Sequence, residues 1–444
     1  MRTSHVRAAL AGALMSAAPV HAVSLEELAK KIEALETQNA ALKAKVEKLE
    51  AAQSQQASQV QQQAQVVANV LQAQAANPGS GAPATVVSSY GEIGYTRPTK
   101  TPDSASVDVA RAVIGIAHRF DDKTRVVGEF EWEHAIASAG DRGEAEVEQL
   151  YVEREFGPGL KGRAGLFLMP VGLLNENHEP TAYYGVFRDD VDTKIIPSTW
   201  REVGLGLSGA TEFGLGWDLG LVTGPNLGKW DPASTEGRDR GPLQSIHGEG
   251  QFAAARNLSI FGAANWRGVP GLLLGGSVFA GRIGNGQLPT GPDTNATLAL
   301  VDLHARYQAQ GWDLAAQYVR GSISHTEALN ASFAASGIEN PTLVPAAFHG
   351  AYVQAAYKLW QAEDYTLAPF VRYERYNTAS SFGSLAVAAG NVIQPDEQVW
   401  TLGANLRIGE GVVLKADYRG YKLNKQAAEF NLGNSFNLGV GYSF

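Results

Sequence analysis

The chain ends on an alternating stretch, Asn434-Ser435-Phe436-Asn437-Leu438-Gly439-Val440-Gly441-Tyr442-Ser443-Phe444. Large apolar residues occupy every second position, from Phe436 to Phe444, and Asn, Gly or Ser lies between them. This period of two places the apolar groups on one face of a β-strand. A closed barrel would pair the backbone groups on both sides of such a strand, because it has no free edge. The stretch therefore predicts the closing strand of a β-barrel.

The same alternation recurs upstream, in Thr124 to His134, Gly311 to Tyr318 and Gln398 to Ile408. A soluble sandwich would bury the aromatic face, whereas a membrane barrel would turn it toward lipid and the charged face toward a watery lumen. The alternation fits both arrangements. The sequence contains no run of about 20 apolar residues that would form a membrane-spanning helix. The final Phe444 resembles the end of the closing strand of bacterial outer-membrane barrels, which favours the membrane.

The first 22 residues predict a secretory signal peptide. Arg2 and Arg7 form a basic start, Ala8 to Ala18 is a short apolar core, and Val20-His21-Ala22 offers the small residues of a cleavage site. We therefore expect an exported chain that begins near Val23. The 444 residues carry a formal net charge of -9. They include no cysteine, which is compatible with an exported protein that needs no disulfides but does not decide the question.

Residues 24–76 predict a helical coiled coil. Ser24 and Glu27 form a capping box, and an unbroken heptad pattern follows. A single helix with this apolar stripe would leave it in water, so the pattern predicts an oligomer. The alternative is a Gln-rich linker after Leu49. A Pro/Gly linker is expected at 77–87. The expected core positions are Leu25, Leu28, Ile32, Leu35, Asn39, Leu42, Val46 and Leu49.

Residues 88–444 predict an all-β, transmembrane, antiparallel barrel with alternating short turns and long polar connections. Seventeen candidate strands can be counted. An odd number of strands would put the two termini of the chain on opposite sides of the membrane, whereas both are expected in the periplasm. The conflict falls on Leu258 to Arg267 and Leu272 to Gly281, of which one should merge with a neighbour or lie outside the wall. We therefore expect 16 strands, with 18 as the alternative.

The strand count, the heptads and the strand texture resemble the phosphate-selective porin O/P group of trimeric outer-membrane porins. The resemblance covers about 88–444 and includes no diagnostic substrate motif. It implies a water-filled channel in the bacterial outer membrane, formed by a homotrimer whose coiled coil lies in the periplasm. It also implies outer-membrane lipid and small hydrophilic solutes as partners, with no cofactor and no nucleic acid.

Met169 to Thr199 is a long connection after a clear strand, Leu160 to Leu168. Loops of this length are usually functional. In porins the third extracellular loop folds inward and narrows the pore, and this segment would resemble it; an ordinary surface loop is the alternative. The candidate constriction residues are Glu176, His178, Glu179, Tyr183, Arg188, Asp189, Asp190, Asp192 and Lys194.

The charged faces of the early strands are mainly acidic, and those of the late strands are mainly basic. This difference predicts an acidic wall and a basic wall inside the lumen. Such walls would create a transverse field that orients polar solutes; the alternative is that the charges only solvate the interior. The acidic wall comprises Glu129, Glu131, Glu133, Glu153 and Glu155. The basic wall comprises Arg306, Lys358, Arg372, Arg407, Lys415 and Arg419.

Enzyme signatures are weak. Gly204 to Gly209 matches a dinucleotide-binding pattern, but it lies within a period-two segment with no helix after it. The histidines show no metal-ligand spacing. We therefore expect no enzyme, no metal and a channel for small polar or anionic solutes. The alternatives are a barrel that only anchors a coiled-coil spacer and, less strongly, an outer-membrane hydrolase.

Overall fold

The computed structural model describes residues 84–444 except 139, 287–294, 384–395 and 423–432, together with Lys30, Glu36 and Lys43. The chain divides into two compact units at Pro78 and Gly79, within the expected linker. Lys30, Glu36 and Lys43 are helical. The expected signal peptide and all eight coiled-coil core positions lie outside the described residues. No helix in the described ranges is long and apolar enough to cross a membrane.

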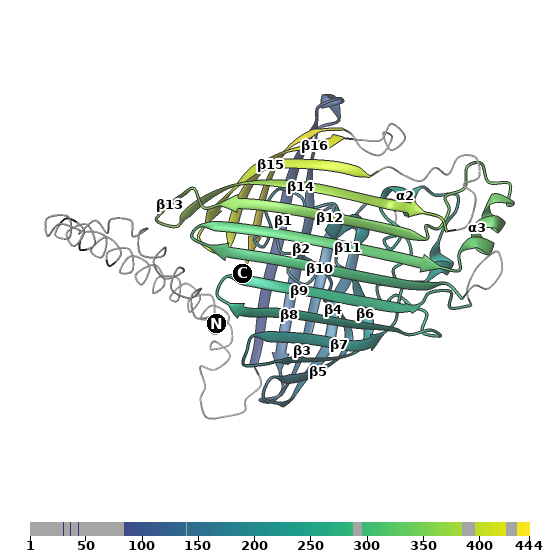
Figure 1. Ribbon diagram of the computed structural model, residues 1–444, viewed down its shortest axis with the longest axis horizontal. Helices are drawn as coiled ribbons and strands as arrows, with labels where there is room; N and C mark the ends of the chain where they lie inside the picture. Colours follow the sequence, from purple (N-terminus) through teal and green to yellow (C-terminus); the bar gives the residue numbers. More distant parts are fainter. Residues whose placement is uncertain are drawn as a thin grey trace, which may run out of the picture. The chain divides into compact units, whose positions relative to one another are not determined.

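The second unit contains one antiparallel sheet that closes on itself (Figure 1). Its described residues form 17 strand segments. The short β13 continues β12, because both segments pair with the same side of β14. The wall therefore has 16 strands, which confirms the expected number. The strands are β1 (Ala84–Pro98), β2 (Ser106–Arg119), β3 (Thr124–Glu133), β4 (Ala145–Gly157), β5 (Leu160–Leu168), β6 (Arg201–Ala210), β7 (Leu215–Val222), β8 (Ser259–Val269), β9 (Leu272–Arg282), β10 (Thr297–Ala309), β11 (Trp312–Ser324), β12 (Ala347–Tyr357), β13 (Trp360–Ala362), β14 (Tyr365–Ser381), β15 (Glu397–Ile408), β16 (Val412–Lys422) and β17 (Ser435–Ser443).

The expected closing strand is β17, which pairs with β16 on one side and β1 on the other. Beyond the end of β17, the backbone N–H of Phe444 donates to Ser89 O at 2.9 Å, and Ser89 N–H donates to Phe444 O at 3.1 Å. The side chains of Phe436 and Tyr442 are 44% and 39% exposed, and Phe444 is 76% exposed on the same outer face. The final residues therefore complete the barrel, as their alternation predicts.

Deleting Phe444 should lower the amount of protein assembled in the membrane. The deletion removes both backbone hydrogen bonds to Ser89, and each contributes about 0.5–1.5 kcal/mol. It leaves the lumen unchanged, because the Phe444 side chain faces outward. Quantitative immunoblots of membrane fractions measure assembly, and single-channel conductance tests the lumen. Normal membrane levels, or altered conductance of the surviving channels, would contradict this role.

Two expected boundaries differ from the structure. The barrel begins at Ala84, four residues before the expected start at 88. The candidate strands at 258–267 and 272–281 are β8 and β9, an ordinary hairpin in which both strands belong to the wall. The expectation that one of them merges or lies outside was therefore wrong. Residues 223–258, which are all described, contain no strand.

Short turns join the strands at one end of the barrel, and longer connections join them at the other. Between the described strands, the third long connection is 169–200, which joins β5 to β6. Figure 1 shows α3 among the long connections, beyond the strand ends. The helices are η1 (Pro102–Ser104), η2 (Val191–Ile195), η3 (Leu227–Lys229), α2 (Glu236–Asp239) and α3 (Glu327–Ala334).

The outer face of the barrel is apolar. Leu402 is 65% exposed, Trp400 55% and Leu205 61%, and exposed apolar residues of this kind occur on most strands. A contiguous apolar surface of this extent is unusual for a soluble protein and fits contact with lipid.

The interior also contains an apolar cluster, which the alternation did not predict. A signal was present in β10, where Thr297 to Val301 is apolar on both faces after its first residue. Residues from the long connections pack there against inward-facing strand residues. This interior cluster comprises Phe167, Met169, Val171, Val191, Ile195, Ile196, Trp200, Val222, Leu227, Trp230, Leu243, Ile246, Phe261, Phe279, Ile283, Ala296, Leu298, Leu300, Ala315, Val319, Ile323, Leu329, Phe333, Leu343, Val344, Phe348, Tyr352, Tyr376, Ala379, Phe382 and Val399.

Candidate functional site

The connection 169–200, called here the inner segment, is tied at its base by Asn175. The Asn175 amide donates to the carbonyls of Met169 and Trp200 at 2.7 and 2.8 Å, and its Oδ1 accepts the Trp200 N–H at 2.7 Å. One buried side chain therefore joins the beginning and the end of a 32-residue excursion from the wall.

The middle of the inner segment packs against the inner face of the barrel seam. Three of the inward-facing residues there are glycines, Gly94 of β1 and Gly439 and Gly441 of β17. A Cβ added at Gly441 would lie 2.4 Å from Pro180, and one added at Gly439 would lie 3.1 Å from Val186. The absence of side chains lets the inner segment approach the wall closely. The geometry thus places this segment inside the barrel.

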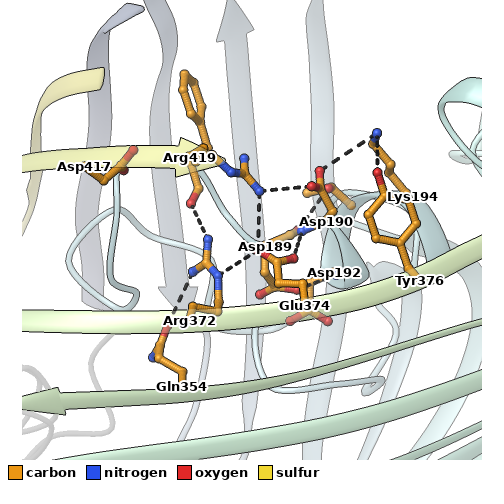
Figure 2. Close-up of polar contacts among 12 residues, drawn as sticks. Asp189, Asp190, Asp192, Lys194, Gln354, Arg372, Glu374, Tyr376, Asp417 and Arg419 are labelled. Carbon is orange, nitrogen blue, oxygen red and sulfur yellow. Dashed lines mark hydrogen bonds and ion pairs between the residues drawn. The ribbon is translucent and has the colours of Figure 1, made fainter. Parts of the chain in front are cut away.

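A buried ionic network holds the next part of the segment against β14 and β16 (Figure 2). Arg419 of β16 lies 3.2 Å from Asp190 and 3.4 Å from Glu374 of β14. Arg372 lies 2.9 Å from Glu374, and the Asp190 N–H donates to the other Glu374 oxygen at 2.5 Å. Lys194 reaches Asp190 at 4.0 Å. Two guanidinium groups and two carboxylates thus neutralise one another around the segment.

Asp190 and Asp192, two of the three buried aspartates of this region, have different environments. Burial alone would raise the pKa of Asp190, but Arg419 and Lys194 outweigh it and hold that pKa below its usual value. Burial and the neighbouring Asp189 raise the pKa of Asp192 well above its usual value. Asp192 Oδ1 accepts a hydrogen bond from Gln317 at 2.8 Å, and its Oδ2 has no partner among the described residues. Asp190 is therefore the ionised anchor, and Asp192 favours the protonated form.

Asp190→Asn should destabilise the protein far more than Asp192→Asn. The first substitution breaks a buried ion pair, which typically costs about 3–5 kcal/mol of stability. In the second, Asn replaces a protonated, uncharged Asp192, so the stability should change little. Because the pKa of Asp190 is lowered, its stabilisation exists at neutral pH and is lost as the pH falls toward that pKa. Urea unfolding of both variants at pH 7 and at about pH 3, below the usual aspartate pKa of about 3.9, measures the difference. Equal losses at pH 7 would contradict the assignment.

Most of the expected basic wall binds the inner segment rather than lining open water. Arg407 donates to the Thr181 carbonyl at 2.6 Å, and Lys415 Nζ lies 3.5 Å from the centre of the Tyr183 ring. Arg306 pairs with Asp313 of the neighbouring strand at 2.6 Å. Lys358 is an exception: it lies exposed in the short connection between β12 and β13, so it does not belong to the lumen wall.

The expected acidic wall lies on the adjacent strands β3 and β4, and five strands separate β3 from β14 by the shorter way round. Glu129 accepts a hydrogen bond from Gln149, and Glu153 pairs with Arg125 at 2.9 Å and Lys161 at 3.3 Å. Glu131 is only 2% exposed. The remaining residues, Glu133 and Glu155, are partly exposed.

A second anchor of the inner segment, centred on His178, involves residues that the sequence analysis missed. The Tyr90 hydroxyl and Glu148 Oε1 lie 2.7 and 2.8 Å from His178 Nε2, and Arg111 donates to the His178 carbonyl at 2.6 Å. Glu148 faces inward because β4 has a bulge there, where Gln149 and Val147 pair with consecutive residues of β3. The available signal was the break in alternation between Val147 and Leu150, which are both exposed on the outer face.

The remaining candidate constriction residues are not all buried. Glu176 is 40% exposed and lies 3.7 Å from Arg163, whereas Glu179 and Arg188 are partly exposed. Arg188 donates to Thr199 Oγ1 at 3.2 Å and attracts Glu131 and Glu133 electrostatically. These three side chains and that of Lys194, which is 26% exposed, rather than the buried aspartates, are charges of the segment that a solute in the lumen could meet.

Comparisons with known proteins agree with this architecture. No family model matches the chain. A relative from Aquifex aeolicus, described as an uncharacterized protein, is 27% identical over 338 residues, which are 75% of this chain and 74% of the relative.

Several solved structures are similar in fold. OmpF of Salmonella typhi in complex with daunomycin has a TM-score of 0.55 and 14% identity, over 81% of this chain and 97% of that chain. The outer membrane channel DcaP of Acinetobacter baumannii has a TM-score of 0.52 and 10% identity, over 83% and 99%. A loop-deletion mutant of OmpT, an outer membrane protein of Vibrio cholerae, has a TM-score of 0.50 and 12% identity, over 82% and 100%. The chain therefore shares the closed antiparallel barrel fold of these outer-membrane proteins.

Proposed function

We propose that the protein is an outer-membrane porin through which small polar or anionic solutes diffuse passively. The observation that carries this proposal is the combination of an apolar outer face, a closed 16-strand wall and a charged inner segment held inside it. A barrel of this size accommodates an aqueous passage, and a loop inside it sets the width and the local charge. The similarity to an outer membrane channel supports the same function.

Planar-bilayer recording of the purified full-length protein tests this proposal. The expected result is stepwise current with a fixed conductance per step, and a reversal potential in a salt gradient that reports ion preference. Glu176→Gln with Glu179→Gln should shift that preference toward anions, most clearly at low salt, where screening is weakest. Absence of current from correctly folded protein would contradict the channel.

The assembly that we propose is a homotrimer whose 24–76 coiled coil lies in the periplasm, with the short turns on the same side. Deleting 24–76 should leave a folded barrel but lower the thermal stability of the oligomer. Sedimentation of the full chain and the deletion variant, with a synthetic 24–76 peptide as a third sample, measures this. A monomeric, unfolded peptide would remove the coiled coil from the proposal.

A barrel that only anchors a coiled-coil spacer is the second candidate. The interior cluster favours it, because many fully buried apolar side chains fill part of the lumen. The same recordings separate the two functions, since an anchor gives no current while a porin gives large steps. Membrane insertion must be verified in parallel by protease protection.

A further inference from the structure

A cavity of about 280 Å³ lies between the inner segment and the inner faces of β1, β16 and β17. Arg188 lines it from the inner segment, and Lys415 and Arg419 line it from β16. Its volume lies near the lower end of small-molecule sites, which is about 300 Å³. The cavity can therefore hold a small solute rather than a chain of sugars or a peptide.

Lys415 provides the main evidence for a ligand. Its side chain is only 4% exposed, and among the described residues Nζ has no hydrogen-bond acceptor and no ion-pair partner within 4 Å. Its contact with the Tyr183 ring leaves the N–H donors of the ammonium group unused. Arg419 Nε, which belongs to the same lining, also lacks a partner in the described part of the chain. Burying a donor without a hydrogen-bond acceptor lowers the stability of the fold. An acceptor on a ligand in the cavity would remove that cost.

The charge balance of the cavity favours an anion. Its carboxylate, Glu92, is already satisfied by Arg111 Nε at 2.8 Å and by the Tyr183 hydroxyl at 2.6 Å. Arg419 is offset by Asp190 and Glu374, as described above. Lys415 and Arg188 differ from Arg419, because neither has a carboxylate within 4 Å in the described ranges. Two basic side chains without an ion-pair partner among the described residues therefore line the same small space.

The lining also has an apolar part. Val186 and Phe187 contribute it, and Phe187 is 38% exposed although it lies inside the barrel. The glycines Gly94, Gly439 and Gly441 leave the wall beside it flat. An inorganic anion would use the cations but leave this apolar surface uncovered.

We propose that this cavity is a binding site for a small organic anion, whose oxyanion group contacts Lys415 and Arg188 and whose apolar body lies on Val186 and Phe187. This inference rests on the proposed channel function and specifies its solute class. Charge-assisted hydrogen bonds from two cations fix one end of the solute, and the flat apolar wall accepts the other.

Benzoate, butyrate and inorganic phosphate serve as probes with the full-length protein. Calorimetry in detergent measures binding without requiring a channel, and bilayer recording measures block of the current. We expect benzoate to bind saturably and to reduce the current over the same concentration range. Lys415→Met should weaken benzoate binding about tenfold, the usual scale for losing one charge-assisted contact. Arg188→Gln, on the inner segment, serves as a second variant if Lys415→Met does not fold.

Lys161→Met is the matched control, because Lys161 lies on the inner side of β5, outside the cavity, and pairs with Glu153. Benzoate binding that Lys415→Met weakens, in a protein that passes no current, would keep the site and overturn the channel. A conducting channel that binds no benzoate, or whose binding neither Lys415→Met nor Arg188→Gln weakens, would overturn the site and keep the channel. Phosphate binding as tight as benzoate binding would overturn the organic class of the ligand.

Discussion

Arg372→Gln is expected to loosen the inner segment and to lower stability by about 3–5 kcal/mol, the usual cost of breaking a buried ion pair. Arg372 is 1% exposed and donates to Glu374 at 2.9 Å, to the Tyr184 carbonyl at 3.2 Å and to the Phe187 carbonyl at 3.4 Å. The variant loses both attachments to the inner segment and leaves Glu374 with less compensation. Single-channel traces should consequently become noisier or show additional conductance levels, and the urea midpoint should fall.

Arg375→Gln is the matched control on the same strand. Arg375 is 58% exposed and pairs with Asp396 at 2.6 Å, so its removal should cost no more than about 1 kcal/mol. It also points away from the lumen, on the opposite face of β14 from Arg372. Similar losses in the two variants, or quiet current from Arg372→Gln, would show that the buried network does not hold the segment.

Trp200→Ala is the second substitution with a large expected effect. Trp200 is 0% exposed, its ring centre lies 4.6 Å from that of Phe279, and its indole N–H donates to Glu202 at 3.0 Å. Removing the ring leaves a cavity in the interior cluster and takes one hydrogen bond from the buried Glu202. Such substitutions cost about 3–5 kcal/mol, which urea unfolding followed by tryptophan fluorescence can measure.

Trp400→Ala provides the comparison on the outer face. Trp400 is 55% exposed, and its ring centre also lies 4.6 Å from an aromatic neighbour, Tyr373. Lipid or detergent can fill the space that Trp400 leaves, so no cavity forms and the loss should be clearly smaller. A loss equal to that of Trp200→Ala would mean that the interior cluster contributes no more than an outer-face contact.

The sequence by itself determined the barrel. Period-two alternation specifies which side of each strand is apolar, because successive side chains point to opposite faces. The polar turns specify where strands reverse, and the alternation of the last residues identified β17 as the closing strand. These local patterns predict that β17 closes the barrel, but they do not specify the register that pairs Ser89 with Phe444. The sequence count gave one strand too many. The polar, glycine-rich connection before β8 has no clear hydrophobic period, so its sequence alone does not show that it contains no strand.

The tertiary structure alone decided what the charged residues do. In the sequence, Asp190, Asp192 and Glu176 are equivalent acids of one loop. In the fold, Asp190 meets Arg419 from 229 positions away, Asp192 is buried beside another acid, and Glu176 stays 40% exposed. The Coulomb energy of a carboxylate depends on its distance to other charges and on its exposure to water, and neither is a local property of the chain. The sequence therefore identifies the inner segment and its charges, whereas only the packing of that segment against β14, β16 and β17 separates buried anchors from charges that face the lumen.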